Sequence, residues 1–260
     1  MTIGFIGAGK MAEGILSAIE DRKNVVMAEK VAERAAEMSR KYGVATTGDV
    51  REVAKKAKFF FLAVRPQDVD AVAVAVKPIL TEKHTLVSIV AGKTLAKLRK
   101  AFGAKANLVR VMPNLALRAN AGMCAICPAA KTPAKDVKQV EKILGGAGAT
   151  VVLKEKDFDA VTALSGSGPA YFAYMEEAMV EGGVKLGLKP KVARLLAEQT
   201  MYGTAKFLRE SGMDLRPFIE GVCTKGGTTA AGMEKLDVPK FKQIVAATLA
   251  AAAKRSRELA

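Results

Sequence analysis

The first twelve residues constrain the fold of this chain most strongly. Residues 2–6 form a short apolar run typical of a strand, and residues 11–20 have the pattern of a helix. Between them, Gly7, Gly9 and Ala12 have the spacing G-x-G-x-x-A. In such a unit the first glycine makes the turn, the second lets the backbone approach a pyrophosphate, and the small third residue lets helix and strand pack closely. The start of the chain therefore predicts a dinucleotide-binding fold.

Strand-like and helix-like segments then alternate. Strands are expected at 24–28, 44–45, 58–64, 85–90, 107–112, 122–127 and 150–153, with helices at 31–42, 49–56, 94–102 and 133–144 and another beginning at 65. The run at 58–64 is continuously apolar, as in a strand buried on both faces of a parallel sheet. The alternation predicts an α/β N-terminal domain with a doubly wound, Rossmann-type sheet, which we place at residues 1–153.

No strand signal follows residue 153. Helices are expected at 157–164, 169–186, 190–210, 215–222, 229–236 and 239–259. Several are apolar on more than one face, such as 170–183, and helices of that kind must be buried. A domain of this size has little interior in which to bury them. We therefore expect an all-α domain at residues 154–260 that forms an intimate homodimer, or a larger homo-oligomer, through its helices.

The charge of the chain is strongly positive. With 41 Lys and Arg against 26 Asp and Glu, the net charge is +15, which could indicate nucleic acid, a membrane surface or anionic ligands as partners. No tryptophan and only four tyrosines are present, so a base-stacking platform is poorly supplied. No apolar run is long enough to cross a bilayer, and residues 2–8 lack the features of a signal peptide. We expect a cytoplasmic protein without a nucleic-acid or membrane partner.

Cysteine and histidine, the usual ligands of zinc, are scarce in this chain. Cys124 and Cys127 form a C-x-x-C pair, but they lie in an apolar, strand-like run without a second pair to complete a zinc site. We interpret both as core residues. The single histidine, His84, lies in a polar turn, and no nucleophile motif accompanies it. We expect no metal site.

A second glycine-rich stretch lies in the C-terminal third. Residues 224–229 read Thr-Lys-Gly-Gly-Thr-Thr, and Thr228 or Thr229 opens the following helical run. Gly226 and Gly227 would let the backbone approach a ligand, and the N–H groups at the helix start would favour a carboxylate or phosphate. An ordinary glycine turn with a threonine N-cap is the alternative.

The expected cofactor site lies at the carboxyl ends of the strands, where α/β sheets bind ligands. The residues that fall at such ends are Gly7, Glu29, Arg65, Ala91 and Asn114. Glu29 stands where an acid would bond the adenosine ribose, which favours NAD because the acid would repel a 2′-phosphate. Lys30 and Arg34 favour NADP. These residues alone leave the choice between NADPH and NADH open.

Five motifs occur in the order of a known family. They are residues 4–9 (GFIGAG) with Met11 and Ala12, then 63–68 (AVRPQD), 110–114 (RVMPN), 164–171 (LSGSGPAY) and 222–229 (VCTKGGTT). Together they resemble pyrroline-5-carboxylate reductase over nearly the whole chain, the last two motifs being the specific ones. The resemblance implies reduction of the cyclic imine 1-pyrroline-5-carboxylate to L-proline with NADPH or NADH, the final step of proline biosynthesis.

The resemblance also implies roles for individual residues. It places the substrate carboxylate at the hydroxyl of Thr224 and at backbone N–H groups before the helix, where Gly227 and Thr228 lie. It places Thr229 beside the ring nitrogen as the catalytic residue and Glu155 near the substrate. The implied cofactor-binding residues are Gly7, Ala8, Gly9, Lys10, Met11, Glu29, Lys30, Asp49, Ala63, Val64, Arg65, Pro66, Ala91 and Asn114, with residues 63–66 and Asn114 at the nicotinamide end.

The chemistry agrees with these residue types. Hydride attack on an imine needs a protonated nitrogen, or a donor beside it, and needs no metal. A threonine hydroxyl is a poor acid, so Thr229 would orient an iminium that arrives protonated. Alternatives are another cyclic-imine reductase, a 3-hydroxyacid dehydrogenase, or a non-enzymatic dinucleotide- or nucleic-acid-binding protein. The dehydrogenase normally needs a lysine on the helix at 169–186, whose only lysine, Lys185, lies near the far end.

The chain departs from the family at several positions. Lys10 stands where asparagine is frequent, Arg65 replaces the usual lysine, and Leu115 with Ala116 replaces Thr-Pro. Residues 165–168 (SGSG) either belong to the site or only let two helices cross closely. These departures concern the choice of cofactor more than the reaction.

Overall fold

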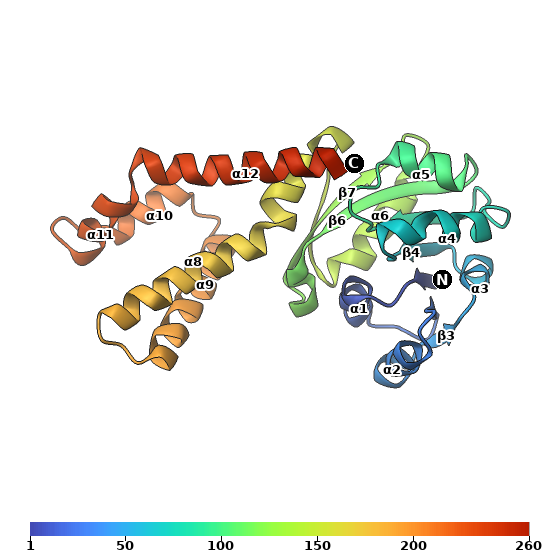
Figure 1. Cartoon of the computed structure of the whole chain (residues 1–260), viewed down its shortest axis with the longest axis horizontal. Helices are drawn as coiled ribbons and strands as arrows, with labels where there is room; N and C mark the ends of the chain where they lie inside the picture. The colour runs from blue at the N-terminus through green and yellow to red at the C-terminus, as the bar shows by residue number, and fades with distance from the viewer. Residues whose placement is uncertain (260) are drawn as a thin grey trace. The chain divides into compact units, whose positions relative to one another are not determined.

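The computed structural model describes residues 1–259 and contains one eight-stranded sheet (Figure 1). Its strands are β1 (Ile3–Ile6), β2 (Val25–Ala28), β3 (Ala45–Thr47), β4 (Phe59–Leu62), β5 (Thr85–Ser88), β6 (Asn107–Pro113), β7 (Gly122–Pro128) and β8 (Gly148–Val152). The order across the sheet is β3-β2-β1-β4-β5-β6-β7-β8. The chain thus runs outward from β1 to β3 and then crosses to β4, so the topological switch point lies between β1 and β4, where α/β sheets bind ligands.

All neighbouring strands are parallel except β6 and β7. The chain between Pro113 and Gly122 is shorter than the dozen or so residues that a parallel crossover needs. Its regular structure is the 3₁₀ helix η2 (Leu115–Ala119), which Asn120 ends in a left-handed conformation with φ of 53°. This tight connection makes β7 antiparallel to β6, a direction that the sequence expectation did not specify.

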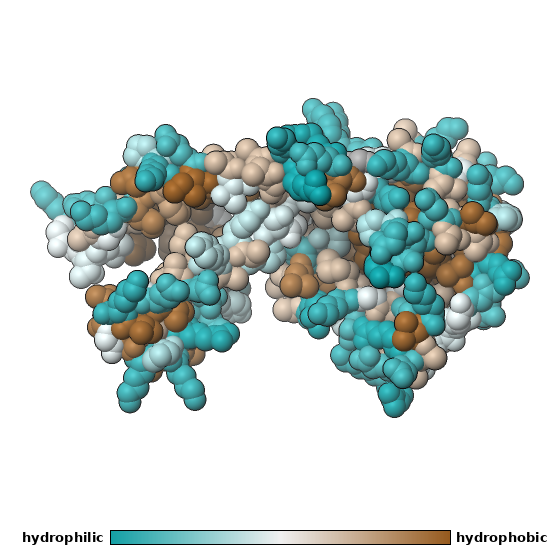
Figure 2. Space-filling view, viewed as in Figure 1, coloured by the Kyte–Doolittle hydropathy of each residue, from teal (hydrophilic) through white to brown (hydrophobic). Residues whose placement is uncertain are grey.

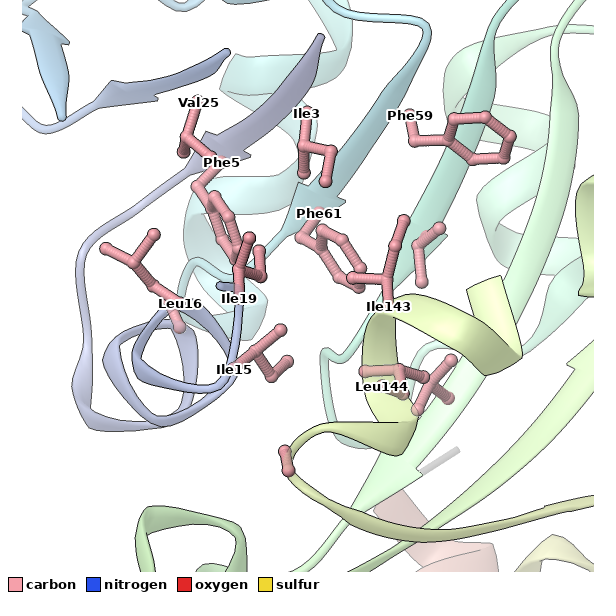
Figure 3. Close-up of a cluster of buried hydrophobic side chains, with 14 of the residues drawn as sticks. Ile3, Phe5, Ile15, Leu16, Ile19, Val25, Phe59, Phe61, Ile143 and Leu144 are labelled. Carbon is pink, nitrogen blue, oxygen red and sulfur yellow. The ribbon is translucent and has the colours of Figure 1, made fainter. Parts of the chain in front are cut away.

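Helices cover both faces of the sheet. The helices α1 (Lys10–Ser17), α2 (Ala32–Tyr42) and α6 (Ala134–Gly145) contribute to one buried cluster, and α3 (Val50–Lys56), α4 (Val69–Val76) and α5 (Leu95–Phe102) contribute to another. Side chains of β4 alternate between them, since Phe59 and Phe61 join the first cluster and Phe60 and Leu62 the second. Figure 3 shows part of the first cluster. The doubly wound α/β sheet is confirmed.

The two cysteines of β7 lie inside this unit. Cys124 and Cys127 are both buried, and burial raises the pKa of the Cys124 thiol to about 11. Such a thiol stays protonated at neutral pH and is a poor nucleophile and metal ligand. Their interpretation as core residues is confirmed.

The described chain divides into two compact units. The sheet unit comprises residues 1–167 and the described residues from 252 onward, and the helical unit comprises residues 168–251. The sheet unit thus extends past the predicted boundary at 153, through η3 (Glu155–Asp157), α7 (Phe158–Val161) and the π-helical η4 (Thr162–Gly166). The reason is packing, because Phe158 is buried against Ala125 and Cys127 of β7.

The helical unit contains no strand among its described residues. Its helices are α8 (Gly168–Lys185), α9 (Pro190–Ser211), α10 (Leu215–Val222), α11 (Thr228–Leu236) and the greater part of α12 (Pro239–Leu259). The helices α8 and α9 pack closely at Gly183, where a Cβ would lie 3.3 Å from the Ala193 methyl group. The all-α character of this region is confirmed.

Few side chains of the helical unit are buried. Its buried residues are Gly168, Ala193 and Ala197. Large apolar side chains are exposed instead, among them these residues of α8 and α9: Phe172, Tyr174, Met179, Leu195, Leu196 and Tyr202. Figure 2 shows hydrophobic surface over this pair of helices. This agrees with the sequence expectation that these helices are apolar on more than one face. None of the helices described is at once long and apolar enough to traverse a lipid bilayer.

The last turns of α12 belong to the sheet unit. The Ser256 hydroxyl donates a hydrogen bond of 2.7 Å to the Asp159 carboxylate. Gly92, with φ of 71°, lies against the end of the same helix, where a Cβ would come within 2.7 Å of the Leu259 carbonyl oxygen. The segment after β5 and the end of α12 therefore pack directly against each other.

Candidate functional site

The glycine turn after β1 is held by its backbone geometry. Gly7 has φ of 96°, and a Cβ there would lie 2.6 Å from the Ala63 carbonyl oxygen at the end of β4. Only glycine fits this position without displacing the backbone. At Gly9 the nearest atom to a Cβ would be 3.9 Å away, so space is open in front of this residue. Gly9 precedes α1, whose start has no side-chain cap, leaving its N–H groups available for an anion.

A cavity of about 500 Å³ opens beside this turn, at the switch point. It brings together eight of the predicted cofactor-binding residues: Gly7, Ala8, Gly9, Glu29, Lys30, Ala63, Val64 and Arg65. Further lining residues that sequence reasoning missed include Val31, Gly48, Val50, Asp68, Ala71 and Val72. The mixture of apolar walls, a glycine turn and one acid at the end of β2 fits a dinucleotide.

Glu29 is fixed in this cavity by the backbone. One oxygen of its carboxylate accepts a hydrogen bond of 2.9 Å from the Ala8 N–H, and the other accepts one of 3.0 Å from the Val31 N–H. Each oxygen has further acceptor capacity, which suits the hydroxyl donors of a ribose. The structure therefore places Glu29 where its spacing from Gly7 predicted an acid.

The basic side chains near Glu29 are paired with acids. Asp68 lies 3.4 Å from the Lys30 ammonium and 3.1 Å from the Arg65 Nε. The guanidinium of Arg65, followed by the ammonium of Lys30, lowers the pKa of the Asp68 carboxyl. Asp68 could have been found in the sequence, because it stands three residues after Arg65 at a predicted helix start, a spacing at which opposite charges meet.

Arg34 supports the glycine turn from α2. Its Nε donates to the Ala8 carbonyl oxygen at 2.9 Å, and its guanidinium lies 2.7 Å from Glu13 and 2.8 Å from Glu37. Glu13 is buried, and hydrogen bonds from Lys41 and Arg34 lower its pKa from 4.5 to about 2. The carboxylate of Glu13 thus joins α1 to α2 beneath the turn.

Six predicted cofactor residues do not line this cavity. Lys10 is exposed at the first position of α1, and Met11 packs partly against the core. Asp49 caps α3 and accepts a hydrogen bond from the Arg51 N–H at 2.9 Å, so its carboxylate serves the helix start. The remaining three follow the strands: Pro66 opens η1 (Pro66–Asp68), Ala91 is exposed after β5, and Asn114 follows β6.

Asn114 joins two of the family-like motifs. Its Nδ2 donates to the Ser165 hydroxyl at 3.4 Å, and its Oδ1 accepts from the Met123 N–H at 3.1 Å. Ser165 lies in the π-helical turn η4, which the Ser167 N–H closes on the Thr162 carbonyl oxygen at 2.8 Å. Single π-helical turns are frequent at functional sites. Ser165 therefore does more than begin a helix, because it bonds to a predicted site residue.

Glu155 is engaged within the sheet unit. Its Oε1 accepts hydrogen bonds from the Leu95 N–H at 2.7 Å and from the Arg110 guanidinium at 3.0 Å. Arg110 is buried and lies 4.7 Å from the centre of the Phe158 ring. Glu155 thus ties the start of α5 to β6. Its predicted contact with the substrate stays a prediction.

The threonine loop, residues 224–229, connects α10 to the start of α11. Gly226 has φ of 72° in open space, and Gly227 donates to the Thr224 carbonyl oxygen at 2.9 Å. A Cβ on Gly227 would lie 2.4 Å from the Thr224 hydroxyl oxygen, so this glycine leaves room for that hydroxyl. Helix α11 begins at Thr228 with Gly227 as its N-cap and no side-chain cap. The alternative of a threonine N-cap is therefore wrong.

Thr229 occupies the second position of α11 and is half-buried. It lines a small pocket with Gly232, Met233, Lys235 and Leu236. The hydroxyl of Thr224 and the start of α11 thus lie within one short loop, as predicted. Across residues 1–259, no group of three or more His, Cys, Asp and Glu side chains is arranged to hold a metal ion.

Two family models match the chain. One, described as pyrroline-5-carboxylate reductase dimerisation, matches residues 155–259, and the other, described as NADP oxidoreductase, coenzyme F420-dependent, matches residues 2–92. The first begins close to the predicted domain boundary, whereas the compact helical unit begins at Gly168. The division at residue 153 stays a prediction.

Relatives match over the whole length. A pyrroline-5-carboxylate reductase of Pisum sativum is 34% identical over 263 residues, which cover 99% of this chain and 96% of the relative. A pyrroline-5-carboxylate reductase structure from Coxiella burnetii has a TM-score of 0.96 at 30% identity, covering 100% of this chain and 98% of that one. The Plasmodium falciparum pyrroline carboxylate reductase, with NADP bound, has a TM-score of 0.86 at 28% identity and the same coverage.

Proposed function

The chain belongs to the pyrroline-5-carboxylate reductase family, and we propose that its glycine-turn cavity and its threonine loop carry the reaction of that family. The protein is an NAD(P)H-dependent oxidoreductase that reduces 1-pyrroline-5-carboxylate to L-proline, the final step of proline biosynthesis. The observation that supports the assignment of residues most directly is the threonine loop, in which Gly227 makes room for the Thr224 hydroxyl before an uncapped helix start.

The sheet unit binds the cofactor in this proposal. The reduced nicotinamide supplies the hydride. The N–H groups of Gly9 and of the start of α1 bind the pyrophosphate, and Glu29 accepts hydrogen bonds from the adenosine ribose. Ala63, Val64, Arg65, Pro66, Ala91 and Asn114 follow the strands at the same edge, and we assign residues 63–66 and Asn114 to the nicotinamide end.

The threonine loop binds the substrate in this proposal. The Thr224 hydroxyl and the N–H groups of Gly227 and Thr228 donate to the substrate carboxylate, an arrangement that helix starts favour for anions. The Thr229 hydroxyl accepts a hydrogen bond from the protonated ring nitrogen and so orients the imine. This hydroxyl is too weak an acid to protonate that nitrogen efficiently at neutral pH. Most of the rate then comes from holding the imine carbon in position for hydride attack.

The test is steady-state kinetics of Thr229→Ala with Thr229→Ser as its control. Loss of an orienting hydroxyl should lower kcat by about a hundredfold with a smaller change in KM, because orientation acts mainly in the transition state. The serine variant keeps the hydroxyl and should recover most of kcat. An alanine variant with wild-type turnover would remove Thr229 from the mechanism, whereas equal losses in both variants would indicate a packing role for its methyl group.

The assembly and the compartment complete the proposal. The C-terminal region matches a dimerisation family model, which supports self-association through it. We propose an intimate homodimer or a larger homo-oligomer, because the exposed apolar side chains of α8 and α9 need a partner. The cytoplasmic location remains a prediction.

A further inference from the structure

We propose that this enzyme prefers NADH to NADPH, and that Glu29 and Asp68 set the preference. The proposal rests on the cofactor cavity of the proposed function and goes beyond it by choosing between the two cofactors. They differ only at the adenosine 2′ position, which carries a hydroxyl in NADH and a doubly charged phosphate in NADPH. The charges around Glu29 therefore decide which of them binds.

The position of Glu29 is the first observation. Both of its carboxylate oxygens are bonded to backbone N–H groups, those of Ala8 at 2.9 Å and Val31 at 3.0 Å. Turning the side chain away to admit a phosphate would break both bonds. A ribose 2′-hydroxyl can donate to this carboxylate, whereas a 2′-phosphate has no such donor under neutral conditions and repels it.

The pairing of the basic residues is the second observation. A 2′-phosphate is normally met by an arginine or lysine. Lys30 and Arg65 line the cavity, but both contact Asp68, at 3.4 Å and 3.1 Å. Among the lining residues the two positive charges are balanced by those of Glu29 and Asp68. A phosphate entering the cavity would therefore meet no net positive charge.

Arg34, the third basic residue close to Glu29 in sequence, is engaged elsewhere. Its side chain bonds to the Ala8 carbonyl oxygen and to the carboxylates of Glu13 and Glu37, all within 2.9 Å. Only 24% of its side chain is exposed. If the Arg34 side chain turned to a phosphate, it would lose three contacts and leave the buried Glu13 with fewer partners. Arg34 therefore stabilises the glycine turn and does not bind the cofactor.

The test begins with equilibrium binding to the purified protein without substrate. Dissociation constants for NADH and NADPH are measured by nucleotide fluorescence, and those for ADP-ribose and its 2′-phosphate by calorimetry. We expect each 2′-phosphorylated ligand to bind about tenfold more weakly than its partner, since a like charge close by opposes it. Equal or tighter binding of NADPH overturns the proposal.

Variants then assign the preference to its residues. Asp68→Asn leaves Lys30 and Arg65 without their acid and should tighten NADPH binding about tenfold, with less than about threefold change for NADH. Glu29→Gln should weaken NADH and tighten NADPH. Asp70→Asn is the matched control, because this exposed acid lies two residues further on, in the first turn of α4, outside the cavity lining, and its loss changes the net charge equally. It should alter neither constant by more than about twofold.

The outcomes separate this proposal from the assignment of the reaction. If Asp68→Asn and Asp70→Asn change NADPH binding equally, the effect is general electrostatics and Asp68 has no specific role. If both cofactors bind with the expected preference but no pyrroline-5-carboxylate is reduced, the assignment of the substrate fails while the cofactor preference stands. If proline is formed faster with NADPH, the reaction stands and the preference is wrong.

Discussion

Phe60 and Leu62 of the sheet unit are wholly buried between strands and helices, whereas Leu195 and Tyr202 of the helical unit leave 64% and 63% of their surfaces exposed. The sheet unit buries apolar side chains on both faces of its sheet. The helical unit has three buried residues, all of them glycine or alanine. The first unit thus completes a core from its own residues, and the second depends on association for burial.

The proposed site divides in the same way. The cavity for the cofactor is built from residues of the sheet unit and is fixed by backbone hydrogen bonds and ion pairs. The threonine loop belongs to the helical unit and is largely exposed. Binding of the cofactor should therefore survive changes that abolish association, while binding and reduction of the substrate should not.

The largest effect is expected from a charge on the apolar face of α9. Leu195→Glu would bury an unpaired carboxylate in the proposed contact between subunits, so association should weaken by at least about a hundredfold. Light scattering after size exclusion measures the assembly, and nucleotide fluorescence measures cofactor binding. Proline formation should fall together with assembly, while NADH binding changes by less than about threefold.

Val74→Glu is the control for this comparison. Val74 is also an exposed apolar residue, at 78%, but it belongs to α4 of the sheet unit. The assembly of this variant should be that of the wild type. A Leu195→Glu protein that still associates normally would show that this part of α9 faces solvent in the assembly.

The next effect compares two glycines with positive φ. Gly7 has φ of 96° and Gly226 has φ of 72°, but a Cβ on Gly7 meets the Ala63 carbonyl oxygen at 2.6 Å and one on Gly226 meets nothing within 4 Å. Gly7→Ala should cost about 3 kcal/mol in the free energy of unfolding and abolish cofactor binding, while Gly226→Ala should cost about 1 kcal/mol. Urea unfolding measures both, and equal costs would contradict the crowding at Gly7.

A smaller effect is expected at Glu13 and depends on pH. The folded protein lowers the pKa of Glu13 from 4.5 to about 2, so the carboxylate stabilises the fold above pH 4.5 and loses this contribution as the pH falls toward 2. Glu13→Gln should lower the free energy of unfolding by about 2 kcal/mol at pH 7. The deficit should shrink as urea titrations move from pH 5 to about pH 3.

Glu33→Gln removes an exposed carboxylate from the first turn of α2 and is the control for Glu13. It should change stability by less than about 0.5 kcal/mol at each pH. A Glu13 deficit that does not vary with pH would mean that the side chain acts through its shape and hydrogen bonds rather than its charge.

Much of the sheet unit could be predicted because its signals are local. The continuous apolar run of β4 requires burial on both faces, and the spacing of Gly7, Gly9 and Ala12 requires a strand, a turn and a helix. The helices of the second unit were predicted with similar bounds from their periodicity and from Pro190 and Pro239 at their starts. Glu29 was predicted from its spacing along the sequence from the glycine turn.

Other features depend on partners that lie far apart in the sequence. The ion pair between Lys30 and Asp68 joins the segments that follow two different strands. The charge balance of the cavity could therefore not be derived from the residues next to Glu29. Likewise, Glu155 stands in a charged run but bonds to the buried Arg110. The sheet unit extends beyond residue 153 because Phe158 is buried against β7. This burial could not be predicted, because the two segments come together only in the folded sheet.

The return of the chain to the sheet unit has a consequence for biosynthesis. Residues from 252 onward, which hold Ser256 against Asp159 and Leu259 against Gly92, are translated after the whole helical unit. During synthesis on the ribosome, the contacts of Gly92 and Asp159 with the end of α12 can therefore form only after the helices of the second unit have been made.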